Sequence, residues 1–228
     1  MNMTKEKKPN FIIIGAMKAA TTSLYTYLKQ HPDVFMTTIK EPMFFNNFQK
    51  KNNFKVAGRK TKKITTFEEY YPLFDAVKNE KAIGEASPAY ISNENCPSLI
   101  KQHLPDTKII AVLRQPVARA YSNFLHARMA DREPIANFET AFNKEKERKA
   151  ENWSPLYHYK DKGYYAEQLE RYYNLFPKEN IKVLLFEDLV ENPIKTTQEV
   201  FKFLNIDKSF IPDTSKKVNV SGTPKGLF

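Results

Sequence analysis

One lysine and a run of hydroxyl side chains lie close together near the start of the chain. The sequence reads Ala16-Met17-Lys18-Ala19-Ala20 and continues directly into Thr21, Thr22 and Ser23. Small side chains let an anion approach the backbone, hydroxyl groups can donate hydrogen bonds to it, and the lysine adds a full positive charge. These residue types at this spacing indicate an anion-binding site.

The flanking residues predict the elements that hold this loop. Residues 11–14 are β-branched or aromatic and stop at Gly15, which is typical of a short buried strand. Thr21 to Ser23 open an amphipathic helix. The N–H groups of a first helical turn have no intrahelical partner, and the helix dipole adds positive charge there. A strand, a loop of small residues and a helix N-terminus together predict an anion cradle.

The loop is close to a Walker A motif but differs in the place of its lysine. Walker A requires G-x-x-x-x-G-K-[ST], in which the lysine directly precedes the hydroxyl residue. Here Lys18 comes three positions before Thr21, and the sequence contains no Gly-Lys pair. An ordinary nucleotide kinase is therefore disfavoured. A plain strand-to-helix turn with an incidental lysine remains an open alternative for the loop alone.

A second set of anion-binding residue types follows the apolar run at residues 108–113 (KIIAVL). Arg114 comes directly after this run, and a guanidinium can bind a phosphate with two parallel hydrogen bonds. Ser122 lies two turns along the following helix, where its hydroxyl can bind the same anion. A surface arginine and an unrelated helix serine are the alternative for this pair. Together with the Lys18 loop, the pair indicates a ligand with two phosphate groups.

Short apolar runs alternate with helical segments along the chain. We predict strands at residues 11–14, 81–85, 108–113 and 181–186, with a further short strand at 34–36. This alternation predicts a single α/β domain with a mostly parallel central sheet flanked by helices. Ligands of such sheets bind at the carboxyl ends of the strands, where Gly15, Glu85 and Arg114 fall.

The composition supports one folded domain. The chain has 228 residues, of which 41% are hydrophobic and 13% aromatic, and this argues against disorder. A net charge of +10, from 36 Lys and Arg against 26 Asp and Glu, attracts anions. Charge alone leaves small anions, anionic polymers and nucleic acids open. No zinc-finger or RNA-binding aromatic motif occurs, so we do not expect a nucleic acid partner.

Other sequence features bear on the compartment and on the chain ends. No apolar run approaches the roughly 20 residues of a membrane span, and no signal-peptide pattern precedes Phe11. Cys96 is the single cysteine, which excludes an intrachain disulfide and disfavours a cysteine metal site. We therefore expect a cytoplasmic protein. Residues 1–9 are expected to form a flexible leader, and residues 10–228 the domain.

These motifs resemble those of the sulfotransferases that use 3′-phosphoadenosine 5′-phosphosulfate (PAPS) as donor. The segment GAMKAATTSL (15–24) is similar to the 5′-phosphosulfate loop of that family, and LRQPVARAYSNF (113–124) is similar to its 3′-phosphate motif. Further similarity lies in KEPMFF (40–45), GEASPAY (84–90), GYYAEQLERY (163–172) and FEDLVENPIKTTQEVFKFLNI (186–206).

The resemblance implies a fold, a donor and the residues that bind the donor. It implies the P-loop-like sulfotransferase fold with PAPS as the sulfuryl donor. We expect no metal, because the cradle is already cationic. The residues that it implies at the 5′ end are Lys18, Ala19, Ala20, Thr21, Thr22 and Ser23, and those at the 3′-phosphate are Arg114 and Ser122.

Within the family, the chain is most similar to the carbohydrate-acting branch of heparan sulfate sulfotransferases and their bacterial relatives. In that branch an E-x-H-F-F element supplies a catalytic glutamate, and Glu41 occupies its position. Met43 stands where those enzymes often carry the histidine, and Ala86 where some carry a lysine. His126 matches a histidine that follows the motif serine by one helical turn in N-sulfotransferases. The implied catalytic residues are Lys18, Glu41 as the first candidate for the base, and His126 as the second.

Plainer interpretations of these residues stay open. Glu41 can form a surface ion pair with Lys40, and His126 can be a helix-packing residue. Glu85 can orient an acceptor or pair with Lys18. The lysine-rich stretch at residues 50–63 can hold an anionic acceptor or form a solvated surface.

The implied function is transfer of a sulfuryl group from PAPS to a hydroxyl or amine of an acceptor, with a carbohydrate as the expected class. The alternatives are a P-loop-type nucleotide kinase and a non-catalytic anion- or nucleotide-binding protein. Members of the family usually continue, after the loop that corresponds to residues 219–222, with a basic loop and a C-terminal helix. We therefore expect this chain to lack the C-terminal segment.

Overall fold

A parallel sheet forms the centre of the molecule. The computed structural model describes residues 7–48, 54–55 and 63–215, and within them five strands form one sheet in the order β2-β3-β1-β4-β5. Every neighbouring pair in it is parallel. The strands are β1 (Phe11–Gly15), β2 (Val34–Met36), β3 (Ala82–Ala86), β4 (Lys108–Leu113) and β5 (Ile181–Leu185). The predicted parallel α/β fold is confirmed, with each strand boundary within one residue of its prediction.

The central strands are apolar because both faces of the sheet are covered. The side chains of residues 11–14 in β1 are fully buried, and so are those of residues 109–112 in β4. The pairing places Phe11 between Gly84 on β3 and Lys108 on β4. A Cβ atom on Gly84 would lie 2.3 Å from the Phe11 ring, so that ring requires a glycine beside it.

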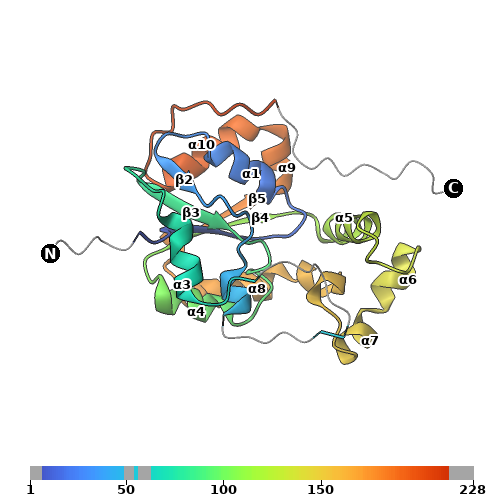
Figure 1. Cartoon of the computed structure of the whole chain (residues 1–228). Helices are drawn as coiled ribbons and strands as arrows, with labels where there is room; N and C mark the ends of the chain where they lie inside the picture. The colour runs from blue at the N-terminus through green and yellow to red at the C-terminus, as the bar shows by residue number, and fades with distance from the viewer. Residues whose placement is uncertain (1–6, 49–53, 56–62, 216–228) are drawn as a thin grey trace.

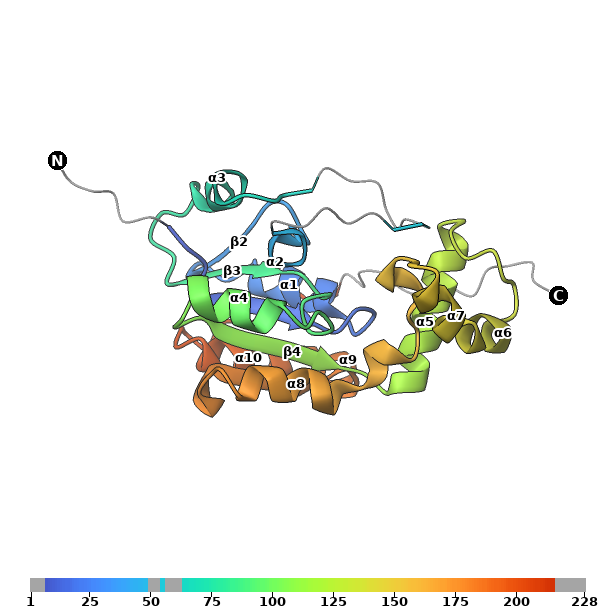
Figure 2. The same cartoon turned by 90° about the horizontal axis from the view of Figure 1, so that it is seen from below.

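Helices cover both faces of the sheet. In Figure 1, α1, α9 and α10 lie on one face, and α4 and α8 lie on the other. Figure 2 shows α4 and α8 from their own side, with α3 near the edge formed by β2 and β3. The helices are α1 (Thr21–Leu28), α2 (Phe44–Asn47), α3 (Phe67–Tyr70), α4 (Cys96–His103), α5 (Pro116–Met129), α6 (Phe138–Asn143), α7 (Glu145–Ala150), α8 (Tyr165–Tyr173), α9 (Phe186–Glu191) and α10 (Pro193–Phe203).

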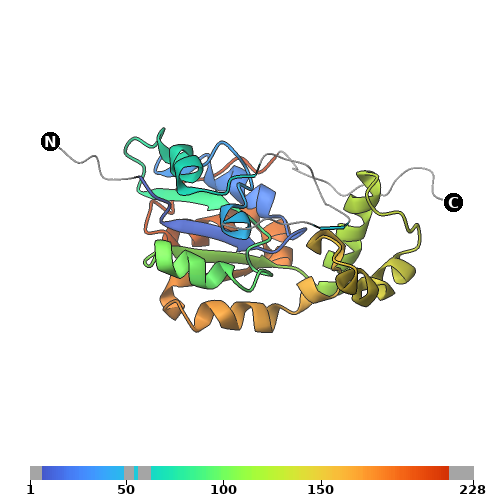
Figure 3. The ribbon, with the colours of Figure 1, turned by 60° about the horizontal axis from the view of Figure 1, so that its bottom comes forward.

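Helices α5, α6 and α7 extend the molecule at one end of the sheet. They lie beyond the carboxyl end of β4 in all three ribbon views, most clearly in Figure 3. This extension has its own apolar cluster, which contains Ala120, Phe124, Ala141 and Tyr159. The extension therefore has a core separate from that of the sheet.

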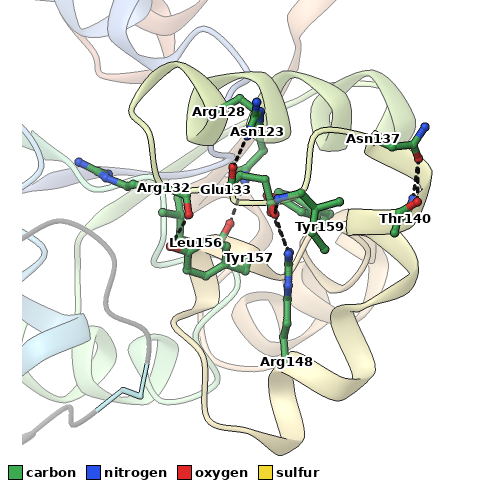
Figure 4. Close-up of polar contacts among 11 residues, drawn as sticks. Asn123, Arg128, Arg132, Glu133, Asn137, Thr140, Arg148, Leu156, Tyr157 and Tyr159 are labelled. Atoms are coloured by element: carbon green, nitrogen blue, oxygen red, sulfur yellow. Dashed lines mark hydrogen bonds and ion pairs between the residues drawn. The ribbon is translucent and has the colours of Figure 1, made fainter.

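A buried ion pair joins the parts of this extension. Both carboxylate oxygens of Glu133 accept hydrogen bonds from the Arg148 guanidinium, at 2.8 and 2.6 Å (Figure 4). The Tyr159 hydroxyl donates to the same carboxylate at 2.6 Å. The pair is almost fully buried, with side-chain exposures of 3% for Arg148 and 0% for Glu133. It connects α7 to the segment that follows α5.

Candidate active site

The β1–α1 loop combines strained backbone with an uncapped helix start. Lys18 has a φ of 68° and Ala20 a φ of 60°, a left-handed conformation that costs free energy in residues other than glycine. Ala20 is the N-cap residue of α1, and its side chain provides no capping hydrogen bond to the first turn. Its first-turn residues Thr21, Thr22 and Ser23 carry no negative charge. The turn is therefore suited to an anionic ligand.

Gly15 is required where β1 ends. A Cβ atom at this position would lie 2.4 Å from Cγ2 of Ile91, and the Ile91 N–H donates to the Ile14 carbonyl at 2.8 Å. On the other side, the Ala16 N–H donates to the Val112 carbonyl at 2.7 Å. The loop thus begins between the ends of β3 and β4. The strand order reverses at β1, which is where open α/β sheets bind their ligands.

Arg114 lies directly against the Lys18 loop. Its Nη1 donates to the Lys18 carbonyl oxygen at 3.0 Å, and its guanidinium lies 4.3 Å from the centre of the Phe186 ring. The Tyr165 hydroxyl donates to the Arg114 carbonyl at 2.9 Å. The structure therefore brings together the two segments that the sequence predicts as anion sites.

The charges around Lys18 include both signs. Burial lowers the pKa of the Lys18 ammonium, and Arg114 lowers it further. Glu41 acts in the opposite direction, and Lys40 adds a smaller lowering effect. Two cations in a partly desolvated site favour an anionic ligand.

Glu41 lies on an exposed, anchored loop. Its carboxylate accepts a hydrogen bond from Lys40 Nζ at 2.8 Å, and its side chain is 44% exposed. Its backbone N–H donates to the Ala86 carbonyl at 3.1 Å. The ion pair that the sequence leaves open is therefore present. The carboxylate is also accessible, because the side chain is 44% exposed, so Glu41 stays a candidate base.

Ser122 and His126 both lie on α5, the helix that follows Arg114. Ser122 is buried, and His126 is exposed one helical turn later. The Ser122 contact with a 3′-phosphate and the catalytic role of His126 stay predictions.

The surroundings of Glu85 fit neither role that the sequence suggests for it, which are orienting an acceptor and pairing with Lys18. The side chain is fully buried, and its carboxylate accepts hydrogen bonds from Tyr70, Ser87 and Tyr90 at 2.9, 2.6 and 2.9 Å. Burial raises the pKa of this carboxyl group to about 7. A fully buried carboxylate enclosed by hydroxyls is not placed to contact an acceptor, and its hydrogen-bond partners among the described residues are these three hydroxyls rather than Lys18. Ser87 and Tyr90 share a motif with Glu85, whereas nothing in the sequence links Tyr70 to it.

Some predicted features lie outside the described residues. These are residues 1–6 of the expected leader, the lysine-rich stretch 50–63 apart from residues 54, 55 and 63, and the loop at 219–222.

Comparisons with known proteins agree with the geometry. The sequence profile of the family described as "Sulfotransferase domain" matches residues 8–220. A crystal structure of a sulfotransferase from Alicyclobacillus acidocaldarius is 36% identical with a TM-score of 0.85, covering 93% of this chain and 87% of that chain. Mouse sulfotransferase SULT7A1, in a structure complexed with PAP, is 16% identical with a TM-score of 0.57, covering 87% of this chain and 59% of that one. At that identity it shows the fold alone.

A curated relative is much longer than this chain. Bifunctional heparan sulfate N-deacetylase/N-sulfotransferase 1 of Mus musculus is 30% identical over 212 residues, which are 89% of this chain and 23% of the relative. The chain therefore spans about a quarter of that protein's length.

Proposed function

The chain belongs to the sulfotransferase domain family, and on that premise we propose that it moves a sulfuryl group from PAPS to a hydroxyl or amine of a carbohydrate. The observation that carries the proposal is the hydrogen bond from Arg114 to the Lys18 carbonyl, because it joins two anion-binding segments into one site. Similarity to a heparan sulfate N-sulfotransferase supports a carbohydrate acceptor. Membership of this family disfavours the nucleotide kinase and the non-catalytic binder.

The donor contacts follow from the residue types at the site. Lys18, the first-turn N–H groups of α1 and the hydroxyls of Thr21 to Ser23 would bind the 5′-phosphosulfate. Arg114 has five N–H donors, and its bond to the loop uses one of them, so others can bind the 3′-phosphate together with Ser122. Membership of the sulfotransferase domain family supports this choice of donor, whose desulfated form is PAP.

The reaction resembles phosphoryl transfer in its demands on the protein. The acceptor oxygen or nitrogen bonds to sulfur while the bond from sulfur to the bridging oxygen breaks, and PAP leaves. Negative charge grows on the phosphate side of that bond, where the Lys18 ammonium stabilises it. Glu41 takes the proton that the acceptor loses, and His126 is the alternative base.

We propose the cytoplasm as the compartment. The support is the sequence, which contains one cysteine, Cys96. As a separate observation, none of the helices in the described part of the chain is long and apolar enough to cross a bilayer.

Calorimetric titration tests the donor site. Wild type, Arg114→Ala and Lys78→Ala are titrated with PAP and with adenosine 5′-monophosphate, which lacks the 3′-phosphate. Lys78 is a matched control because it is exposed and precedes β3. It therefore lies toward the amino ends of the parallel strands, whereas Arg114 follows the carboxyl end of β4. We expect Arg114→Ala to weaken PAP binding about 10- to 100-fold and to weaken binding of the monophosphate much less. Lys78→Ala should bind both nucleotides as wild type does. Absent PAP binding, or equal losses for both nucleotides, would contradict the assignment.

A further inference from the structure

Three buried hydroxyl groups surround the Glu85 carboxylate at the end of β3. The Tyr70 and Tyr90 hydroxyls both donate to Oε1 at 2.9 Å, and Ser87 Oγ donates to Oε2 at 2.6 Å. All four side chains are 0% exposed. When Glu85 is ionised, its carboxylate can only accept hydrogen bonds, so each hydroxyl then directs its single proton at Glu85.

This orientation leaves oxygen lone pairs on the hydroxyls facing elsewhere, and two hydroxyls use them to accept N–H groups from a neighbouring segment. The Met43 N–H donates to Ser87 Oγ at 3.0 Å, and the Phe45 N–H donates to the Tyr90 hydroxyl at 3.2 Å. Both donors lie in the segment 41–45, which carries Glu41. The carboxylate is thus connected to that segment through two hydroxyls.

The segment needs such anchors because its backbone is strained. Glu41 has a φ of 58° and Met43 a φ of 55°, and both are residues with a Cβ atom in the left-handed region. Such conformations persist when the surrounding structure fixes them. A further anchor comes from the same strand end, since the Glu41 N–H donates to the Ala86 carbonyl at 3.1 Å.

We propose that Glu85 is a positioning residue which, through Ser87 and Tyr90, holds segment 41–45 in the conformation that presents the Glu41 carboxylate to the site of transfer. The proposal deepens the function above and rests on Glu41 as the base. Glu85 itself is enclosed by hydroxyls and touches neither donor nor acceptor. Glu85 acts on the segment indirectly, because it orients the hydroxyl protons of Ser87 and Tyr90 toward itself and leaves their lone pairs to accept the Met43 and Phe45 N–H groups.

The two tyrosines provide a matched pair of variants. Tyr70 and Tyr90 are both fully buried and donate to the same carboxylate oxygen at the same distance. The Tyr90 hydroxyl also accepts a hydrogen bond from the Phe45 N–H, whereas among the described residues the Tyr70 hydroxyl bonds to Glu85 alone. Tyr70→Phe and Tyr90→Phe therefore remove equivalent contacts to Glu85 but differ at segment 41–45.

Amide hydrogen exchange tests the positioning independently of catalysis. In the full chain we expect Tyr90→Phe to speed exchange at Phe45, and Ser87→Ala to speed it at Met43, each about 5- to 10-fold. In Tyr70→Phe both amides should exchange within about twofold of wild type. Equal acceleration in Tyr70→Phe and Tyr90→Phe, or none in Tyr90→Phe, would overturn the proposal whatever the enzyme's activity.

Transfer kinetics connect the segment to Glu41. We expect Tyr90→Phe to lower kcat about tenfold or more with the Kd for PAP unchanged, because a small displacement of a reacting group is costly. In a Glu41→Gln background the same change should have little further effect, since the misplaced group is already absent. An equal loss in both backgrounds would refute the link to Glu41. If Glu41→Gln were fully active while the exchange pattern held, the proposed base would fail and the anchoring would stand.

Discussion

The Arg114 guanidinium donates from Nη1 to the backbone carbonyl oxygen of Lys18, at 3.0 Å, across 96 residues of sequence. Arg114 follows β4 and Lys18 follows β1, and these strands are neighbours in the sheet. The contact makes the two predicted anion-binding segments parts of one site. A change at Arg114 should therefore affect the 5′ loop as well as the 3′-phosphate.

Arg114→Lys should weaken PAP binding although it keeps the charge. A lysine cannot bind the Lys18 carbonyl, pack on Phe186 and hold a phosphate with a planar fork at the same time. We expect about a tenfold loss of affinity by calorimetry. Wild-type affinity in Arg114→Lys would mean that a point charge is sufficient there.

Glu41→Gln should lower kcat about 10²- to 10⁴-fold, since it removes the proposed base while keeping the size of the side chain. The matched control is Lys40→Gln, which breaks the exposed ion pair at 2.8 Å. That control should change the free energy of unfolding by less than about 0.5 kcal/mol and retain most activity. Full activity in Glu41→Gln would move the base elsewhere, and His126→Ala would be the next variant to measure.

The stability of the protein should depend on pH through Glu85. Burial raises the pKa of this carboxyl group to about 7 in the folded state, from its ordinary value of 4.5. Between these values the folded protein binds the proton more strongly than the unfolded chain, so this contribution to stability is present at low pH and is lost as pH rises through 7. Buried Tyr70 and Tyr90 have raised pKa values and stay neutral in this range.

Denaturant unfolding of wild type and Glu85→Gln at pH 5 and pH 8 measures this contribution. The stability of wild type relative to the variant should fall by roughly 2–3 kcal/mol between the two pH values, at 1.36 kcal/mol per pKa unit. A constant difference, or a rise with pH, would show that the carboxylate is not disfavoured in the folded state.

Arg148→Met should destabilise the protein by about 3–5 kcal/mol, because it leaves the Glu133 charge buried without its ion-pair partner. Lys144→Met is the control, since Lys144 pairs with Glu147 at 2.5 Å on the exposed surface of the same region. It should change the free energy of unfolding by less than about 1 kcal/mol. Denaturant titration measures the free energy of unfolding of both variants. If Arg148→Met and Lys144→Met were equally and only slightly destabilised, the buried ion pair would be no more important than the exposed one.

The sequence predicts the sheet well, because the signal for its strands is local. β1 and β4 are continuous apolar runs that end at Gly15 and Arg114, so both the strands and the ends that bear the site could be recognised. The Lys18 loop could be recognised for the same reason, since its small residues, lysine and hydroxyls are consecutive.

The hydroxyl partners of Glu85 and the backbone conformation at Glu41 depend on tertiary structure and could not be predicted. Tyr70 comes from a different element than Glu85, and only folding places its hydroxyl on the carboxylate. Glu41 and Met43 adopt left-handed backbone without being glycine, and the sequence carries no signal for this. Such conformations are imposed by the surrounding structure rather than preferred by the residues themselves.

Transfer of a labelled sulfuryl group from PAPS is the test of whether the protein is a carbohydrate sulfotransferase that uses Lys18. Wild type, Lys18→Ala and the exposed control Lys78→Ala are incubated with labelled PAPS and an N-deacetylated, unsulfated heparan-type polysaccharide, and labelled polysaccharide is counted. We expect label transfer by wild type and Lys78→Ala, with transfer by Lys18→Ala reduced at least about 100-fold while its unfolding transition is retained. Equal transfer by Lys18→Ala and wild type, or no transfer by wild type while it binds PAP, would contradict this function.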